Sequence, residues 1–141
     1  MVREEGDDMT KADLTELRRL HTACRTIEEH IDRLRSSAER YSAPLSGMPH
    51  APAWQDQMAE YVARLDDLQR RWTEIRTEIE IKGQQLEIEL QILGPEEYRI
   101  MFMRYIEGYG WHKIQRRMHY SDRQVFRIHA AALVKLSVNV S

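Results

Sequence analysis

The sequence lacks the patterns that mark several large classes of protein. Its 141 residues include one cysteine, Cys24, which cannot form an internal disulfide and lies in an apolar stripe where a buried, reduced thiol is expected. No run of about 18 apolar residues is present, so no membrane-spanning helix is expected. The first residues are acidic and lack the apolar segment of a signal peptide. These absences together predict a cytoplasmic protein.

The motifs of common enzyme classes are also absent. There is no glycine-rich phosphate-binding loop, no His-Glu-x-x-His motif and no pair of cysteines. His21 has no second metal ligand at helical spacing and is expected to pack on the apolar side of its helix. The histidines near the C-terminus are explained by turns or by nearby phosphates. We therefore expect no enzymatic activity, no metal site and no cofactor.

The remaining composition favours an all-α protein with long solvated helices, because 42% of the residues are hydrophobic and 31% are charged. A first helix is expected from Thr10, because apolar residues then recur at steps of three and four along one face. Three prolines and a glycine in residues 42–53 end this helix and predict a loop. The apolar positions are Leu14, Leu17, His21, Cys24, Ile27, Ile31, Leu34, Ala38 and Tyr41.

A second long helix is expected to begin near Ala53 or Trp54. Its apolar positions follow a heptad spacing through Met58, Tyr61, Leu65, Leu68, Trp72, Ile75 and Ile79. Further on, Ile81, Ile88 and Ile92 form a second stripe. Two such helices joined by a short loop predict a long antiparallel, coiled-coil-like hairpin over residues 1–93.

The apolar faces of this hairpin are wider than one helix pair can cover, so a partner is expected. Self-association, with a dimer favoured, is the simplest solution. The candidate oligomerisation residues are Leu65, Leu68, Trp72, Ile75 and Ile79. The alternative is a monomer in which the hairpin packs against the C-terminal domain.

Residues 94–141 show the pattern of a helix-turn-helix domain. Gly94-Pro95 ends the second helix and starts a third, which Gly108 and Gly110 interrupt. Next comes a short helix with Trp111, Ile114 and Met118 facing inward, then the turn His119-Tyr120. Ser121 is a good N-cap for a last helix. Its buried face is formed by Val125, Ile128, Leu133 and Leu136.

Charge is distributed unevenly along the chain. Residues 95–141 hold eight Lys or Arg against four Asp or Glu, whereas residues 1–94 hold thirteen against nineteen. A basic C-terminal part favours contact with nucleic acid there. Spacing alone fits a plain helical bundle equally well. If the domain binds DNA, the last helix would enter the major groove through Ser121, Asp122, Arg123, Gln124, Phe126 and Arg127, and phosphates would be contacted by Lys113, Arg116 and Arg117.

The segment from Tyr120 to Leu136 resembles the helix-turn-helix of bacterial sigma factor region 4, including the Ala-Leu-x-x-Leu ending at Ala132-Leu133-Val134-Lys135-Leu136. The combination Arg104-Tyr105-Ile106-Glu107-Gly108-x-x-Trp111 with Tyr120-Ser121-x-Arg123-Gln124-Val125-x-Arg127-Ile128-His129 is closer to the RinA/ArpU-like phage transcription regulators. Their Tyr-x-x-Pro-x-x-x-x-Met-Pro linker is similar to residues 41–49 here.

This resemblance implies a sequence-specific, DNA-binding transcription regulator of phage or prophage origin that acts on late genes in a bacterial host cell. RNA polymerase is a further candidate partner. Two alternatives stay open. One is a phage DNA-packaging recognition subunit, similar to a small terminase, which would form a ring. The other is a module that binds polymerase without touching DNA.

Overall fold

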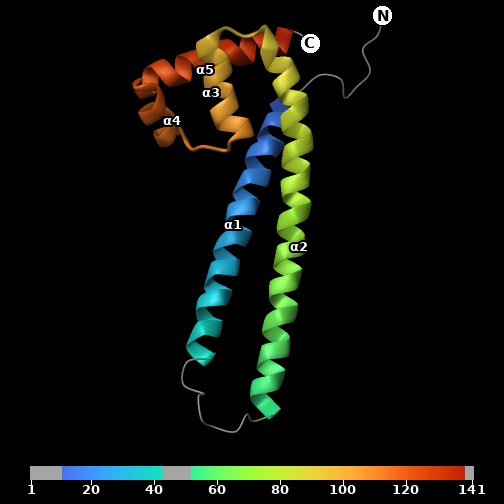
Figure 1. Cartoon of the computed structure of the whole chain (residues 1–141). Coiled ribbons are helices and arrows are strands. Elements are labelled where there is room, and N and C mark those ends of the chain that lie inside the picture. The colour runs from blue at the N-terminus through green and yellow to red at the C-terminus, as the bar shows by residue number, and fades with distance from the viewer. Residues whose placement is uncertain (1–10, 43–51, 139–141) are drawn as a thin grey trace, which may run out of the picture. The chain divides into compact units, whose positions relative to one another are not determined.

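The structure is a computed structural model that describes residues 11–42 and 52–138, and all of its regular elements there are helices (Figure 1). The all-α prediction is therefore confirmed for the described residues. Most of the loop predicted at residues 42–53 lies outside them. In order, the elements are α1 (Lys11–Ser42), α2 (Pro52–Glu89), the 3-10 turn η2 (Leu90–Ile92), α3 (Pro95–Met101), the π-helical turn η3 (Phe102–Ile106), α4 (Trp111–Met118) and α5 (Asp122–Val138).

The helices group into two compact units that divide both long helices. Among the described residues, 22–42 and 52–77 form the two-helix unit, and 11–21 together with 78–138 form the core unit. The sequence placed a domain boundary between residues 93 and 94 instead. The difference arises because the start of α1 and the end of α2 pack with the C-terminal helices.

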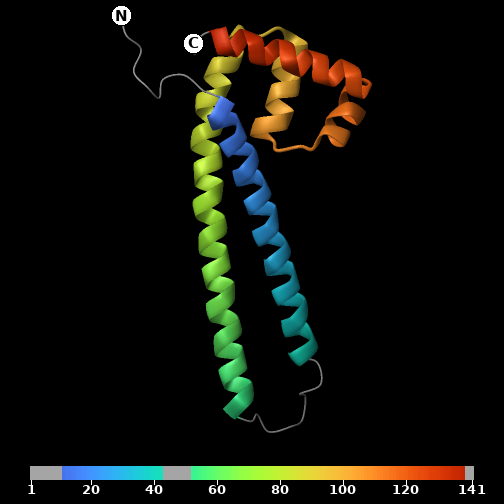
Figure 2. The same ribbon diagram turned by 180° about the vertical axis from the view of Figure 1, so that it is seen from behind.

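In the two-helix unit, α1 and α2 run side by side in opposite directions (Figures 1 and 2). Among its described side chains, Cys24 is buried and all the others keep some exposure. Burial is the main reason why the pKa of the Cys24 thiol is raised. The indole Nε1 of Trp72 donates to Glu28 Oε2 across the pair at 3.2 Å. Two helices cover only one side of each other, so the apolar positions between them stay half-buried.

The core unit holds the well-packed interior. Its buried hydrophobic side chains come from every helix of the unit: Leu14, Leu17, Leu20, Ile79, Leu86, Leu90, Ile100, Met101, Met103, Tyr105, Ile114, Met118, Val125, Ala132 and Leu136. The predicted inward positions of α4 and α5 are buried or half-buried. In a regular helix Ile106 would share the inner face with Ile100 and Met103, six and three residues earlier, but Ile106 is half-buried, whereas Tyr105 is buried. The π-helical turn accounts for this difference, because it adds residues to one turn and so rotates the positions that follow.

Gly108 ends this turn and allows the chain to approach α1. Its φ of 80° is positive, and the backbone N–H groups of Glu107 and Tyr109 donate to the carbonyls of Phe102 and Met103 at 3.0 and 2.8 Å. The side chain of His21 is buried opposite this bend, and its Nε2 lies 2.9 Å from the Tyr105 carbonyl oxygen. His21 is thus part of the core, where it ties α1 to the π-helical turn.

Candidate nucleic-acid interface

A tight turn joins α4 to α5. His119 follows α4 in the left-handed conformation, with φ 59°, and its backbone N–H donates to the Gln115 carbonyl. The N–H of Tyr120 donates to the same carbonyl at 3.2 Å. These two hydrogen bonds give the Gln115 carbonyl its partners at the end of α4, where the chain turns towards α5. The predicted turn at His119-Tyr120 is confirmed, and α5 starts immediately after it.

Ser121 and Gln124 cap the first turn of α5 reciprocally. The backbone N–H of Gln124 donates to Ser121 Oγ at 3.3 Å, which confirms the predicted N-cap. The Gln124 side-chain oxygen in turn accepts the Ser121 backbone N–H at 3.0 Å. This is the capping box, whose Ser-x-x-Gln signature was already present in the sequence. Gln124 therefore has a structural role beside its predicted role as a base contact.

An aromatic cluster fixes the start of α5 against α4. The ring of Trp111 meets Phe126 edge to face at 5.1 Å and His129 edge to face at 4.9 Å between centroids. The guanidinium of Arg104 lies over the Trp111 ring at 4.1 Å, a cation–π contact. Phe126 is still 46% exposed. The cluster thus holds an aromatic edge at the surface in a defined position.

His129 forms the inner side of this cluster. Its Nε2 lies 2.8 Å from the Tyr105 hydroxyl. Burial, and then the positive charges of Arg104 and Lys11, lower the pKa of His129 to about 4. The ring is therefore neutral near pH 7, and its Nε2 can accept a hydrogen bond from the Tyr105 hydroxyl.

Exposed cations surround the cluster. Along α4 and α5 the acidic side chain is Asp122 alone, and Lys135 is paired with Glu97 at 2.6 Å. The ammonium of Lys113 lies 3.9 Å, and the guanidinium of Arg117 5.2 Å, from the Tyr109 ring centre. The remaining exposed basic side chains on these helices are Arg116, Arg123 and Arg127. The surface is positive and its cations are partly positioned by aromatic rings.

The structure places the residues that the sequence proposed for DNA contact on two adjacent elements. All of them are exposed: Ser121, Asp122, Arg123, Gln124, Phe126 and Arg127 in the first turns of α5, and Lys113, Arg116 and Arg117 on α4. Sequence reasoning missed the supporting roles of Arg104, Tyr109 and His129. These residues lie on different elements, so no spacing within one helix indicates their contacts.

The predicted oligomerisation residues behave differently. Leu65, Leu68, Trp72 and Ile75 are half-buried in the two-helix unit, and Trp72 bonds to Glu28 of α1. Ile79 is buried in the core unit. Ile79 therefore packs inside its own chain, and Trp72 makes at least one hydrogen bond within that chain.

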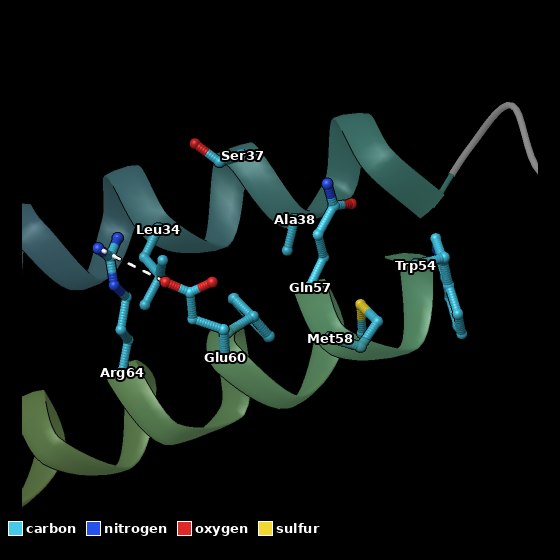
Figure 3. A pocket seen from close by; sticks show the side chains of 9 residues that line it. Leu34, Ser37, Ala38, Trp54, Gln57, Met58, Glu60 and Arg64 are labelled. Atoms are coloured by element: carbon cyan, nitrogen blue, oxygen red, sulfur yellow. Dashed lines mark ion pairs between the residues drawn. The ribbon is translucent and has the colours of Figure 1, made fainter. Parts of the chain in front are cut away.

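A groove lies between the end of α1 and the start of α2 (Figure 3). Leu34 and Ala38 line it from α1, and Trp54 and Met58 line it from α2. Its carboxylate, Glu60, lies 3.9 Å from the guanidinium of Arg64 one turn away. Among the described residues, no His or Cys side chain lines this groove.

Comparisons with protein-family models, with curated proteins and with solved structures find no match to this chain. Within residues 11–42 and 52–138, no group of three or more His, Cys, Asp or Glu side chains could hold a metal ion. In the same part of the chain, no helix is both long and apolar enough to cross a membrane.

Proposed function

We propose that this protein is a sequence-specific DNA-binding transcription regulator, of the kind found in phages and prophages, that acts in the bacterial cytoplasm. The observation that carries the proposal is the exposed, cationic start of α5, which the Ser121–Gln124 cap and the Trp111 cluster hold rigidly. A recognition helix presents its first residues to base edges, and a helix with a fixed start loses little freedom on binding.

In this proposal α5 lies in the major groove. Arg123 and Arg127 are one turn apart and would contact guanine edges, for which a guanidinium is suited. The bond between Gln124 and Ser121 makes Gln124 a weaker candidate for an adenine contact. Lys113, Arg116 and Arg117 on α4 would contact phosphates, which set the register without distinguishing sequences.

The resemblance to RinA/ArpU-like regulators supports the same proposal and adds late genes as targets and RNA polymerase as a further partner. The charge distribution agrees with it, since residues 95–141 hold eight Lys or Arg against four Asp or Glu, whereas acidic residues outnumber basic ones in residues 1–94. An acidic N-terminal half would be repelled by phosphates and is better suited to binding protein.

The test is selection of bound duplexes from fragmented phage and host DNA, followed by gel shifts with the selected and scrambled sequences. We expect the selected duplex to bind about 1,000-fold or more tightly than the scrambled one. The double variant Arg123→Ala/Arg127→Ala should reduce that ratio strongly. Equal binding of both duplexes, or no binding, would contradict the proposal. A protein that binds polymerase but no DNA would support the interaction-module alternative, and a DNA-binding ring would support the packaging alternative.

A further inference from the structure

Three isoleucines are exposed on one face of the last part of α2 and the η2 turn. Ile81, Ile88 and Ile92 are 53%, 73% and 55% exposed. A step of seven residues brings Ile81 and Ile88 to the same side of α2, and Ile92 follows four residues later at the end of η2. Large apolar side chains clustered on a surface mark an interaction site more often than single ones do. The geometry points to this isoleucine face as the contact through which two copies of the chain form a homodimer.

The charge pattern identifies a second copy as the partner. In a two-fold symmetric dimer each patch meets an identical patch, so a charge near the axis faces its own copy and is repelled. The residues that lie between these isoleucines on the same side, Gln84 and Gln85, are exposed and uncharged. Amides carry both donors and acceptors, so they can pair with copies of themselves.

The rest of α2 is less suited to self-pairing. Its exposed positions from Gln55 to Glu78 are rich in Asp, Glu and Arg, several of them in ion pairs along the helix. The apolar positions there are half-buried in the two-helix unit. The dimer contact therefore lies at Ile81–Ile92 rather than at the heptad positions Leu65–Ile79. It does not depend on DNA binding.

The test measures the mass of the full-length protein in solution. Size-exclusion chromatography with light scattering on the wild type should give twice the chain mass of 16.8 kDa. Ile88→Lys places a charge at the centre of the isoleucine face, where it would meet its copy. We expect this variant to have the mass of one chain and an unchanged helical circular dichroism spectrum.

Val62→Lys is the matched control, because Val62 is 57% exposed on the same helix, about five turns before Ile81. It should leave the dimer mass unchanged. The inference is overturned if the wild type is a monomer or a larger ring, if Ile88→Lys remains a dimer, or if Val62→Lys dissociates the protein equally. A second variant, Ile81→Lys, guards against a local effect at Ile88 and should also give monomers.

Discussion

The imidazole of His21 occupies the space into which a side chain on Gly108 would project. A Cβ added at Gly108 would lie 2.4 Å from Nδ1 of His21 and 2.7 Å from its Cγ. The ring cannot move away without breaking its contact with the Tyr105 carbonyl oxygen at 2.9 Å. This contact joins α1 to the turn after α3, so the start of α1 depends on a glycine more than eighty residues later.

Gly108→Ala should destabilise the protein strongly. The positive φ costs about 1–2 kcal/mol for any residue with a Cβ, and forcing an atom into a filled site costs about 1–3 kcal/mol more. Gly83→Ala is the control, because a Cβ there would meet Ile106 at an ordinary 3.9 Å. It should stabilise α2 by about 0.5–1 kcal/mol. Urea unfolding monitored by circular dichroism measures the free energy of unfolding of both variants. If Gly108→Ala left that free energy unchanged, the close approach of His21 to Gly108 would be contradicted.

Stability should fall as the pH is lowered through the range set by His129. The folded pKa of about 4 lies below the ordinary value of 6.5, so the unfolded chain binds the proton more readily. The stabilisation from the neutral ring is complete above pH 6.5 and is lost progressively as the pH falls towards 4. Urea unfolding between pH 7.5 and 5 should show this slope, and His129→Gln should reduce it. Equal slopes in the wild type and His129→Gln would mean that His129 is not buried in its neutral form.

A fragment of residues 94–141 should not melt cooperatively. Several contacts join this segment to the rest of the core unit. His21 Nε2 contacts the Tyr105 carbonyl oxygen, and Arg18 Nη1 donates to the Arg104 carbonyl at 3.2 Å. The side chain of Ile106 lies close to Gly83. A longer fragment, residues 78–141, should gain helicity and thermal stability when a peptide of residues 8–24 is added. Calorimetry and circular dichroism test this. A cooperative melting transition for residues 94–141 alone would instead support the domain boundary that the sequence predicts between residues 93 and 94.

Arg127→Ala and Arg117→Ala should separate base contacts from phosphate contacts. If Arg127 contacts a base, its loss should cost about 1–3 kcal/mol on the selected duplex and relax the preference at one position. If Arg117 contacts a phosphate, its loss should weaken all duplexes alike and reduce the salt dependence by about one unit. Titrations of both variants at several salt concentrations provide the measurement. Arg127 is not a base contact if its variant keeps the full sequence preference.

Phe126 should contribute to recognition of thymine. Its ring is 46% exposed on the helix that carries Arg123 and Arg127, and Trp111 meets it edge to face. Phenylalanine in the major groove contacts the thymine methyl group, which uracil lacks. Replacing thymine by uracil at each position of the selected duplex should weaken wild-type binding at one position, and Phe126→Ala should remove that effect. If the protein binds specifically and tolerates uracil everywhere, Phe126 does not contact a methyl group.

Sequence alone determined the helices and their ends, because these depend on local chemistry. The periodic apolar residues of α1 and α2, Pro95 after Gly94, Gly108 at the helix break and Ser121 at the cap are all signals within a few residues of the feature they produce. The exposure of the candidate DNA contacts in the first turns of α5 followed from the same periodicity. The capping role of Gln124 could also have been predicted from its spacing to Ser121.

Only the tertiary structure decided which surfaces are used within the chain. The heptad positions of α2 give no indication that Ile79 is buried in the core unit while Ile88 is exposed. The contacts of His21 with Gly108, of His129 with Tyr105 and of Arg104 with Trp111 join residues from different elements. Such contacts depend on how the helices pack, and helix packing is set by the summed shape of many side chains rather than by any local pattern.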